Sequence, residues 1–469
     1  MKPFAFSIVP VDVPCVKTEY RCIQTAIPVP QSLPIIEKIT RYESRSMHGQ
    51  MPVVWGRAKD LQVFDHWGNI WIDFTSTIFV TNAGHANEKI LNALRGVLDQ
   101  ELLHTYTYAS KIRASFLEKL VNCAPASLGK AYLVSAGTEA TEMVLKLIRL
   151  NAMKNKKRRP GIIAFDGSFH GRTMGAAQIS GHDAQREWIG YDDPNIFRLQ
   201  FPFGWDDKFN DLSVDGQVQF ERDLEALRAR GIDLENDVGG IVFESYIGWA
   251  AAFYPKEYVQ AWAAFAKTNG ILLAFDEIQA GFGRTGTMFA YEHYDVEADL
   301  ISCGKGLSSS LPLAAVIGRA EIMDLPDEGS MSSTHSANPM SCAAGLANLE
   351  VFEEMNLVEE SKRKGKILKD IVKRLQKKYS DRIAQAPTQG MVTAILLCDP
   401  VTREADGLSA SLICEAALRK GLILVHTGRE SIKIGPPLTI PDEALIEGME
   451  VLEECMDEVF GSICEHSSH

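Results

Sequence analysis

The sequence lacks the features that mark several classes of protein. Its nine cysteines include no Cys-x-x-Cys pair and no Cys/His cluster at zinc spacing, so neither a disulfide framework nor a bound metal is expected. No hydrophobic run approaches the roughly 20 residues that cross a bilayer. Positive charge is also in deficit: the net charge of -13 argues against a nucleic-acid surface, because phosphate binding needs clustered cations. We therefore expect a cytoplasmic protein with reduced cysteines that binds neither membrane nor nucleic acid.

Two short segments could suggest targeting, and neither supports it. The amino-terminal apolar stretch is broken by Pro10 and Pro14 and is too short for a secretory signal. The one basic run, Lys154 to Arg159, stops at Pro160-Gly161. Such a run is typical of a solvated helix end or loop, and we give it no nucleic-acid role.

The length and the apolar pattern predict several domains. A chain of 469 residues suggests two or three, and the first 50 are rich in proline and expected to be extended. Residues 63–65 and 70–74 predict a hairpin. From about 85 to 320, helical patterns alternate with short apolar runs, which predicts an α/β domain with a mostly parallel central sheet flanked by helices. Those runs are 131–134, 162–165, 241–243, 271–275 and 313–317.

Beyond about residue 340 the pattern changes. A long helical stretch is followed by a strand-like run at 391–397, a helix near 409–420 and a short apolar run at 422–425. This order predicts a smaller α+β domain. We place the domain boundaries at 1–65 for an amino-terminal segment, 66–335 for the large domain and 336–469 for the small carboxyl-terminal domain.

An acid and an amine stand out as a pair. The apolar run 271–275 ends in Asp276, and Lys305 lies between two glycines after the strand-like Leu300-Ile301-Ser302. Ligands collect at the carboxyl ends of strands in an α/β sheet, so both groups could face one pocket. An amine that forms a Schiff base and an acid that keeps a pyridinium nitrogen protonated suit pyridoxal 5'-phosphate (PLP). Taken singly, Asp276 is more typical of a helix cap and Lys305 of a solvated loop.

A turn with small and hydroxyl residues precedes the pair. Ser135-Ala136-Gly137-Thr138-Glu139-Ala140 follows one strand and opens a helix. A helix N-terminus with free N–H groups and two hydroxyls suits a phosphate. Ordinary N-capping by Thr138 is the alternative.

A second loop carries an aromatic and an arginine. Phe169, His170 and Arg172 follow the strand that ends near Asp166. An aromatic at a strand end can stack on a cofactor ring, and an arginine can bind a carboxylate through two hydrogen bonds. A core phenylalanine and a surface arginine are the alternatives.

The order of these motifs resembles the class III (ω-type) aminotransferases of PLP fold type I. The resemblance covers roughly residues 50 to 445. It rests on Ser135 to Ala140, Phe169-His170-Gly171-Arg172-Thr173, the block Phe275-Asp276-Glu277-Ile278-Gln279-Ala280-Gly281-Phe282-Gly283-Arg284-Thr285-Gly286, Lys305 and Asn338-Pro339.

The resemblance implies a role for each cofactor residue. Lys305 would form the internal aldimine and then move the substrate proton, and Asp276 would hold the ring nitrogen protonated. Phe169 would stack on the ring and Gln279 would hydrogen-bond its 3-oxygen, with His170 and Glu244 close by. Ser135, Gly137 and Thr138 would bind the phosphate. Thr334 would reach the same phosphate from the other subunit, which implies a homodimer, alone or as a dimer of dimers. Residues 1–65 would pack on the partner subunit and on the small domain.

The sequence also departs from its relatives. The acid Glu244 is followed by Ser245 where Pro is usual. An arginine that recognises 2-oxoglutarate in relatives is Lys433 here, and the glutamate that gates it is Trp249. Lys433 keeps the charge without the planar fork, and a solvated strand-end lysine is the alternative. Arg172 is retained as a carboxylate ligand, and Ile78 matches the 4-aminobutyrate branch of the family.

The predicted function is transfer of an amino group from an amino acid or ω-amine donor to a 2-oxo acid such as 2-oxoglutarate or pyruvate. It would proceed in two half-reactions through pyridoxamine phosphate. A PLP-dependent racemase, epimerase or aminomutase begins with the same deprotonation and is the alternative, with a decarboxylase as a third. A non-catalytic PLP-binding protein would be expected to lack Lys305 or Asp276, and both are present.

Overall fold

The computed structural model of the chain describes residues 4–181, 183–202 and 215–466. By packing, the described residues form two compact units, one from Glu88 to Glu359 and the other from residue 4 to Asn87 together with Glu360 to residue 466. No helix in these ranges is both long and apolar enough to span a membrane. The boundaries at residues 65 and 335 remain a prediction. In the structure, the hairpin strand β5 (Ile70–Asp73) pairs with β16 (Leu422–Ile423), so the early hairpin packs with the carboxyl-terminal part.

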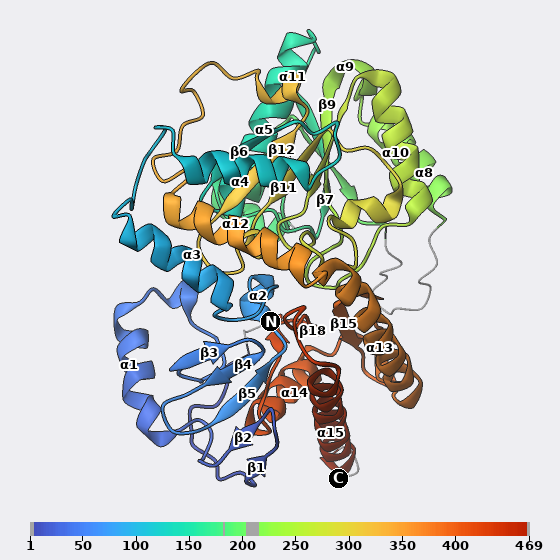
Figure 1. Cartoon of the computed structure of the whole chain (residues 1–469). Coiled ribbons are helices and arrows are strands. Elements are labelled where there is room, and N and C mark those ends of the chain that lie inside the picture. Colours follow the sequence, from blue (N-terminus) through green and yellow to red (C-terminus); the bar gives the residue numbers. More distant parts are fainter. Residues whose placement is uncertain (1–3, 182, 203–214, 467–469) are drawn as a thin grey trace. The chain divides into compact units, whose positions relative to one another are not determined.

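The Glu88–Glu359 unit is built on a seven-stranded sheet in the order β6-β12-β11-β10-β9-β7-β8 (Figure 1). Its strands are β6 (Lys130–Val134), β7 (Gly161–Asp166), β8 (Ile196–Gln200), β9 (Val238–Glu244), β10 (Leu272–Asp276), β11 (Leu300–Cys303) and β12 (Ala314–Gly318). Its helices are α3 (Glu88–Asp99), α4 (Lys111–Asn122), α5 (Gly137–Lys154), α6 (Met174–Gln178), α7 (Asp183–Arg186), α8 (Gly216–Ala229), α9 (Leu234–Asp237), α10 (Lys256–Asn269), α11 (Ala320–Met323) and α12 (Pro339–Glu354).

The predicted, mostly parallel sheet is confirmed, with one exception. Strand β12 runs antiparallel to both β11 and β6. Residues 304–313 connect β11 to β12, and this is shorter than the dozen or more residues that a parallel crossover needs. The loop that carries Lys305 is therefore a return connection.

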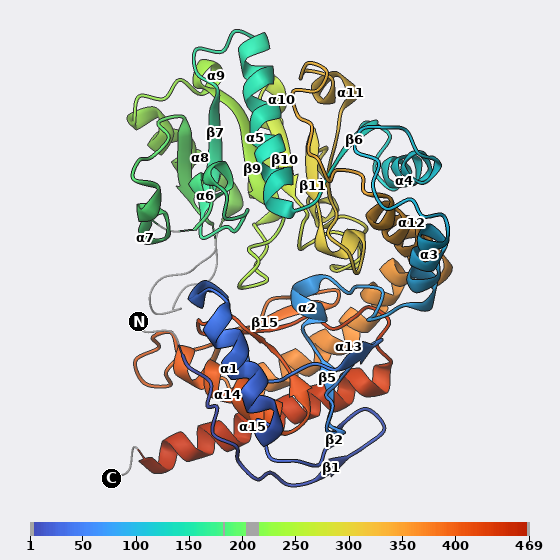
Figure 2. The ribbon, with the colours of Figure 1, turned by 90° about the vertical axis from the view of Figure 1, so that its left-hand side faces the viewer.

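Local patterns explain the flanking helices. Helix α10 buries Tyr258, Trp262 and Ala266 at helical spacing and ends at Gly270, whose φ of 61° is left-handed. Helix α5 lies over one face of the sheet in Figure 2 and contacts β9, β11 and β12. The approach is close: a Cβ on Gly240 of β9 would lie 2.7 Å from a methyl carbon of Ile148.

The other unit holds two smaller sheets. One joins β1 (Val16–Lys17), β2 (Cys22–Ile23), β5, β4 (Gln62–Phe64) and β3 (Arg57–Lys59), with β16 parallel to β5. The other joins β13 (Ile383–Gln385), β15 (Val392–Leu397), β18 (Ser431–Ile434) and β17 (Val425–His426), with β14 (Thr388–Gln389) on β15. The helices are α1 (Leu33–Tyr42), α2 (Ser76–Phe79), α13 (Leu357–Lys378), α14 (Gly407–Arg419) and α15 (Asp442–His466), of which α14 and α15 pack together (Figure 1). The predicted hairpin is confirmed as β4 paired with β5.

The basic run has a structural use that its pattern did not indicate. Lys157 donates to the carbonyl of Asn269 at 2.8 Å, at the carboxyl end of α10, where the helix dipole favours a cation. Arg158 donates from Nε to Oδ1 of the buried Asp237 at 2.6 Å. The run is therefore partly engaged in holding α9 and α10.

Candidate active site

Strand register brings two acids together at the carboxyl edge of the large sheet. Asp276 of β10 lies beside Glu244 of β9 in the parallel ladder. One oxygen of Asp276 is 2.7 Å from Nδ1 of His170, and the other accepts the N–H of Ile278 at 3.0 Å. Asp276 and His170 are 4% and 2% exposed. The carboxylate is thus fixed through both oxygens before any ligand binds.

Burial and neighbouring charges shift the pKa values of three groups at this edge. Burial raises the pKa of Glu244 to about 7, against the opposing effect of His170. Burial lowers the pKa of His170, but the hydrogen bond to Asp276 and the charges of Asp276 and Glu244 raise it further, so the net shift is upward. Burial lowers the pKa of Lys305, although Asp276 and Glu244 raise it. The lysine is therefore biased toward the free amine, the form that attacks a carbonyl.

The loop of Lys305 has an unusual backbone. Lys305 itself has a φ of 45°, in the left-handed region that a residue with a side chain rarely adopts. Asn348 of α12 holds the loop, because its amide donates to the carbonyls of Gly306 at 2.9 Å and Leu307 at 3.0 Å. Asn348 is fully buried. Strain at one residue kept in place by a buried amide is typical of a functional position.

The turn before α5 forms a cradle of small residues. Thr138 does not cap the helix: the N-cap is Ala136, and Glu139 accepts the N–H groups of Ser135 and Ala136 at 2.8 and 3.0 Å. The Thr138 hydroxyl instead lies 2.7 Å from that of Thr173. The alternative interpretation, in which Thr138 is the N-cap of this helix, is therefore wrong.

Two glycines keep this cradle open. Gly171 has a φ of 142°, and a Cβ there would lie 2.2 Å from Oγ1 of Thr138. A Cβ on Gly137 would lie 2.9 Å from the Ile278 side chain. The helix N-terminus and the hydroxyls give donors for an anion, and the glycines give it room.

The aromatic loop lies beside the acids. The N–H of Phe169 donates to Glu244 at 2.9 Å, and the Phe169 side chain is 50% exposed, which leaves its ring available for stacking. The guanidinium carbon of Arg172 lies 5.5 Å from the centre of that ring. Trp249 is fixed by its indole N–H, which donates to the carbonyl of Gly167 at 3.2 Å.

Several contacts of the site could not be read from sequence motifs. The hydroxyl of Tyr246 donates to Oε1 of Gln279 at 3.3 Å. Ser245 donates to the buried Glu277 at 2.5 Å. Thr334 is exposed, and its carbonyl lies 2.9 Å from Nε2 of His104. The departure from Pro at position 245 was the only sequence signal for any of these contacts.

The last two predicted residues belong to the other unit. Lys433 is 3% exposed, and its Nζ lies 4.3 Å from the centre of the Phe79 ring, so it is not a solvated strand-end lysine. Ile78 has a φ of 62° and a side chain 47% exposed. It lines a cavity of about 260 Å³ with Trp55, Met51 and other mostly apolar residues.

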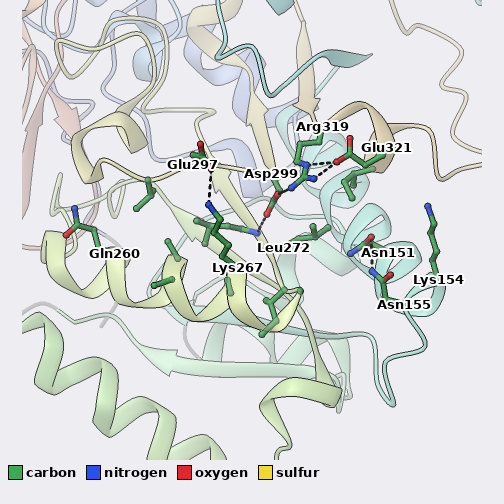
Figure 3. A pocket seen from close by; sticks show the side chains of 18 of the residues that line it. Asn151, Lys154, Asn155, Gln260, Lys267, Leu272, Glu297, Asp299, Arg319 and Glu321 are labelled. Atoms are coloured by element: carbon green, nitrogen blue, oxygen red, sulfur yellow. Dashed lines mark hydrogen bonds and ion pairs between the residues drawn. The ribbon is translucent and has the colours of Figure 1, made fainter.

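A cavity of about 660 Å³ lies elsewhere (Figure 3). It is lined by Leu272, at the start of β10, whereas Asp276 is at the end of that strand. Its Arg319 pairs with Asp299 at 3.0 Å and with Glu321. None of the predicted site residues lines this cavity.

The residues at the carboxyl edge fit PLP. A buried acid, an amine whose pKa is lowered by burial, an exposed aromatic ring and a glycine-lined helix N-terminus lie in one unit. They match a ring nitrogen, an aldehyde, a ring face and a phosphate. The described residues hold no group of three or more His, Cys, Asp or Glu placed to bind a metal ion.

Comparison with known proteins gives consistent matches. A profile of the family described as Aminotransferase class-III matches residues 44–456. The 4-aminobutyrate aminotransferase of Mycobacterium leprae is 31% identical over 93% of this chain and 98% of its own length. The 5-aminovalerate aminotransferase DavT of Pseudomonas putida is 33% identical over 87% of this chain and 94% of its own length.

Solved structures give the same picture. An S-selective transaminase from Arthrobacter sp. matches with a TM-score of 0.80 at 26% identity, over 91% of this chain and 98% of that one. A transaminase from the marine bacterium Virgibacillus matches in fold with a TM-score of 0.82 at 21% identity, over 92% of this chain and 100% of that one.

Proposed function

The chain belongs to the class III aminotransferases, and we propose from that premise that it transfers the amino group of an ω-amino acid to a 2-oxo acid. Family members of this kind use PLP, an amine donor and a 2-oxo acid acceptor, and the fold is PLP fold type I. The names of the relatives favour transamination over the racemase or aminomutase alternative. The observation that carries the proposal is the Asp276–His170 pair in one unit with an amine of lowered pKa.

We assign the proton chemistry to the residues at the carboxyl edge. The bound cofactor would supply an electron sink when a proton leaves the substrate carbon that bears the amino group. Asp276, held by His170, would keep the ring nitrogen protonated. Lys305 would attack the cofactor's aldehyde as a free amine and so hold the cofactor covalently. Once the substrate amine has displaced it, Lys305 would carry the proton to and from the substrate, a role that a lowered pKa favours.

Binding of the cofactor would use the residues around this pair. Phe169 offers an exposed ring for stacking, Gln279 an amide for the 3-oxygen, and Glu244 an acid beside the ring. The phosphate would lie at the start of α5, against Ser135, Gly137 and Thr138. The room left by Gly171 supports this assignment, because the phosphate needs a close approach to the backbone.

The substrate assignment rests on charge. Arg172 is exposed beside the Phe169 ring and could hold a distal carboxylate. The relatives named above act on 4-aminobutyrate and 5-aminovalerate, which are straight-chain ω-amino acids with such a carboxylate. Lys433 would serve the carboxylate of the 2-oxo acid; its burial over Phe79 supports a specific role. Trp249 of the Glu88–Glu359 unit and Ile78 of the other unit remain predicted substrate residues.

We also propose a homodimer. Helix α1 has no buried residue, and its Ile35, Ile39 and Tyr42 lie on one helix face at 39%, 48% and 75% exposed. An unpacked apolar face of this kind fits a partner subunit. Thr334 is exposed and would complete the partner's phosphate site. Light scattering coupled to size exclusion should give twice the chain mass, and a monomer with full activity would contradict the proposal.

The test of function begins with the purified protein and PLP. Borohydride reduction should fix the cofactor to Lys305, and Lys305→Ala should abolish both the fixation and the visible absorbance. Lys267→Ala is the control, since that lysine is 83% exposed on α10. Absence of Lys305 labelling would end the proposal.

A substrate panel then separates the reactions. 4-Aminobutyrate, 5-aminovalerate and unsubstituted alkylamines are tested as donors, with 2-oxoglutarate and pyruvate as acceptors. Transamination predicts one amino acid formed from the acceptor for each donor consumed. Deuterium exchange at the amine-bearing carbon without net transfer would favour the racemase or aminomutase instead. Faster turnover of the ω-amino acids than of alkylamines, lost in Arg172→Met, would support the carboxylate assignment.

A further inference from the structure

Two neighbouring side chains of the segment after β9 each contact the segment after β10. The Ser245 hydroxyl donates to Oε1 of Glu277 at 2.5 Å. The Tyr246 hydroxyl donates to Oε1 of Gln279 at 3.3 Å. Consecutive residues on one segment thus contact alternate residues on the other. The two contacts therefore join the segments that directly follow Glu244 and Asp276.

The first contact, between Ser245 and Glu277, holds the two segments together. Glu277 is fully buried, and besides Ser245 it accepts the N–H groups of Ala290 and Tyr291, both at 2.8 Å. Burial raises the pKa of Glu277 to about 8, whereas these three donors lower it and are matched to a carboxylate. The carbonyl of Ser245 accepts the hydroxyl of Tyr294 at 2.7 Å. The backbone around Gln279 is therefore held in place, and the remaining question is how the side-chain amide of Gln279 is oriented.

The second contact, between Tyr246 and Gln279, bears on this orientation. A side-chain amide presents a donor on one side and an acceptor on the other, and its orientation follows from its partners. Tyr246 is 1% exposed and burial raises its pKa well above 10, so it stays a phenol with a proton to donate. That proton goes to Oε1 of Gln279, which directs Nε2 away from Tyr246.

The space behind Gln279 is closed. A Cβ on Gly248 would lie 3.2 Å from Oε1 and 3.3 Å from Nε2 of Gln279, so the backbone at Gly248 already lies against the amide. The Tyr246 phenol and the backbone at Gly248 thus lie against two sides of the Gln279 amide.

We propose that Tyr246 is a positioning residue that orients the Gln279 amide with its N–H toward the cofactor. The inference rests on the proposed role of Gln279 at the 3-oxygen of the PLP ring. An N–H donor at that oxygen stabilises its anionic form, while an amide oxygen there would destabilise it. Tyr246 would therefore tune the acidity of the lysine-bound cofactor without touching it.

The test uses the full-length protein loaded with PLP. In Tyr246→Phe the amide can turn, so the pH titration of the bound cofactor's visible absorbance should move to higher pH. The dissociation constant for PLP should rise roughly 3- to 10-fold, the scale of one modest hydrogen bond. An unchanged titration and an unchanged dissociation constant would overturn the proposal.

A matched tyrosine separates positioning from folding. Tyr258 is also fully buried, and its hydroxyl donates to Asp223 at 2.5 Å, away from Gln279. Tyr258→Phe should lower the thermal midpoint of the cofactor-free protein and leave the cofactor titration in place. If Tyr258→Phe moves the titration as far as Tyr246→Phe does, the effect is general loosening and the proposal fails.

Variants of Gln279 keep the outcomes distinct. Gln279→Ala should move the titration, and Tyr246→Phe added to it should have no further effect. If Gln279→Ala leaves the titration unchanged, the role of Gln279 is wrong and the inference fails while the aminotransferase function stands. Gln279→Glu keeps an acceptor for Tyr246 but offers no N–H, so it should move the titration upward even if Tyr246→Phe does not fold. No shift in that variant would also refute the inference.

Discussion

Removal of the Asn348 amide should loosen the loop that carries Lys305. The amide donates two hydrogen bonds, to the carbonyls of Gly306 and Leu307, from a position that is fully buried in α12. Its own oxygen has no hydrogen-bond partner among the described residues. The Asn348 side chain therefore acts as a donor. Its substitution leaves the carbonyls of Gly306 and Leu307 without this hydrogen-bond donor.

The magnitude follows from those two carbonyls. A buried group left without its partner costs about 1–3 kcal/mol, so Asn348→Ala should lower the free energy of unfolding by about 2–6 kcal/mol. Asn348→Asp keeps the shape of the side chain but places a carboxylate oxygen, an acceptor, against the two carbonyl oxygens. It should therefore lower the free energy of unfolding by at least as much. Because Lys305 is held with a φ of 45°, the loop should relax toward ordinary backbone angles once the amide is gone.

Urea unfolding of the cofactor-free protein measures the first effect, and hydrogen exchange of residues 304–311 measures the second. Asn151→Ala on α5 is the control, since Asn151 is buried but only accepts one bond, from Asn155 at 3.2 Å. Asn151→Ala should lower the free energy of unfolding by less than Asn348→Ala does, and it should leave the hydrogen exchange of residues 304–311 unchanged. A loss below about 1 kcal/mol in Asn348→Ala, with loop exchange unchanged, would refute the reasoning.

Three further predictions concern single groups of the site. The folded-state pKa of Glu244 is raised from 4.5 to about 7. Its contribution to the free energy of unfolding is therefore fully present below pH 4.5 and is lost as the pH rises through 7. Glu244→Gln should remove about 3 kcal/mol of this pH dependence, measured from the urea midpoints of the cofactor-free protein at several pH values. Gly171→Ala places a Cβ 2.2 Å from Thr138 Oγ1 and should weaken PLP binding at least tenfold, whereas Gly190→Ala, with nothing within 4 Å, should not; equal affinities would argue against the cradle. The lowered pKa of Lys305 predicts labelling by an amine-reactive probe at lower pH than for exposed lysines, and coincident pH profiles would contradict it.

Much of the large unit could be predicted because its signals are local. Short apolar runs gave the strands at 131–134, 162–165, 241–243 and 271–275, and the structure confirms each within a few residues. Strand β8 was missed, because Arg198 interrupts its apolar pattern at the sheet edge. The strand at 313–317 is confirmed as β12, but its antiparallel direction was not predicted, since the direction of a strand depends on the length of its connection and not on its own residues.

The site shows the same division. The acid, the lysine and the helix turn were found from the sequence, because each lies within a short motif of its own. The contact of His170 with Asp276 joins residues 106 positions apart, and that of Asn348 with Gly306 joins residues 42 apart. Such contacts arise from strand register and helix packing, and no local pattern encodes them.

The sequence by itself determined the family, whose members transfer amino groups, and it predicted an acid and an amine suited to PLP, each after an apolar strand. Only the tertiary structure decided how those groups are tuned. Register placed Glu244 beside Asp276, burial lowered the pKa of Lys305, and Tyr246 met Gln279. The physical reason is that a pKa and an amide orientation depend on which groups are close in space and how much water they have lost, and both are set by packing between distant segments.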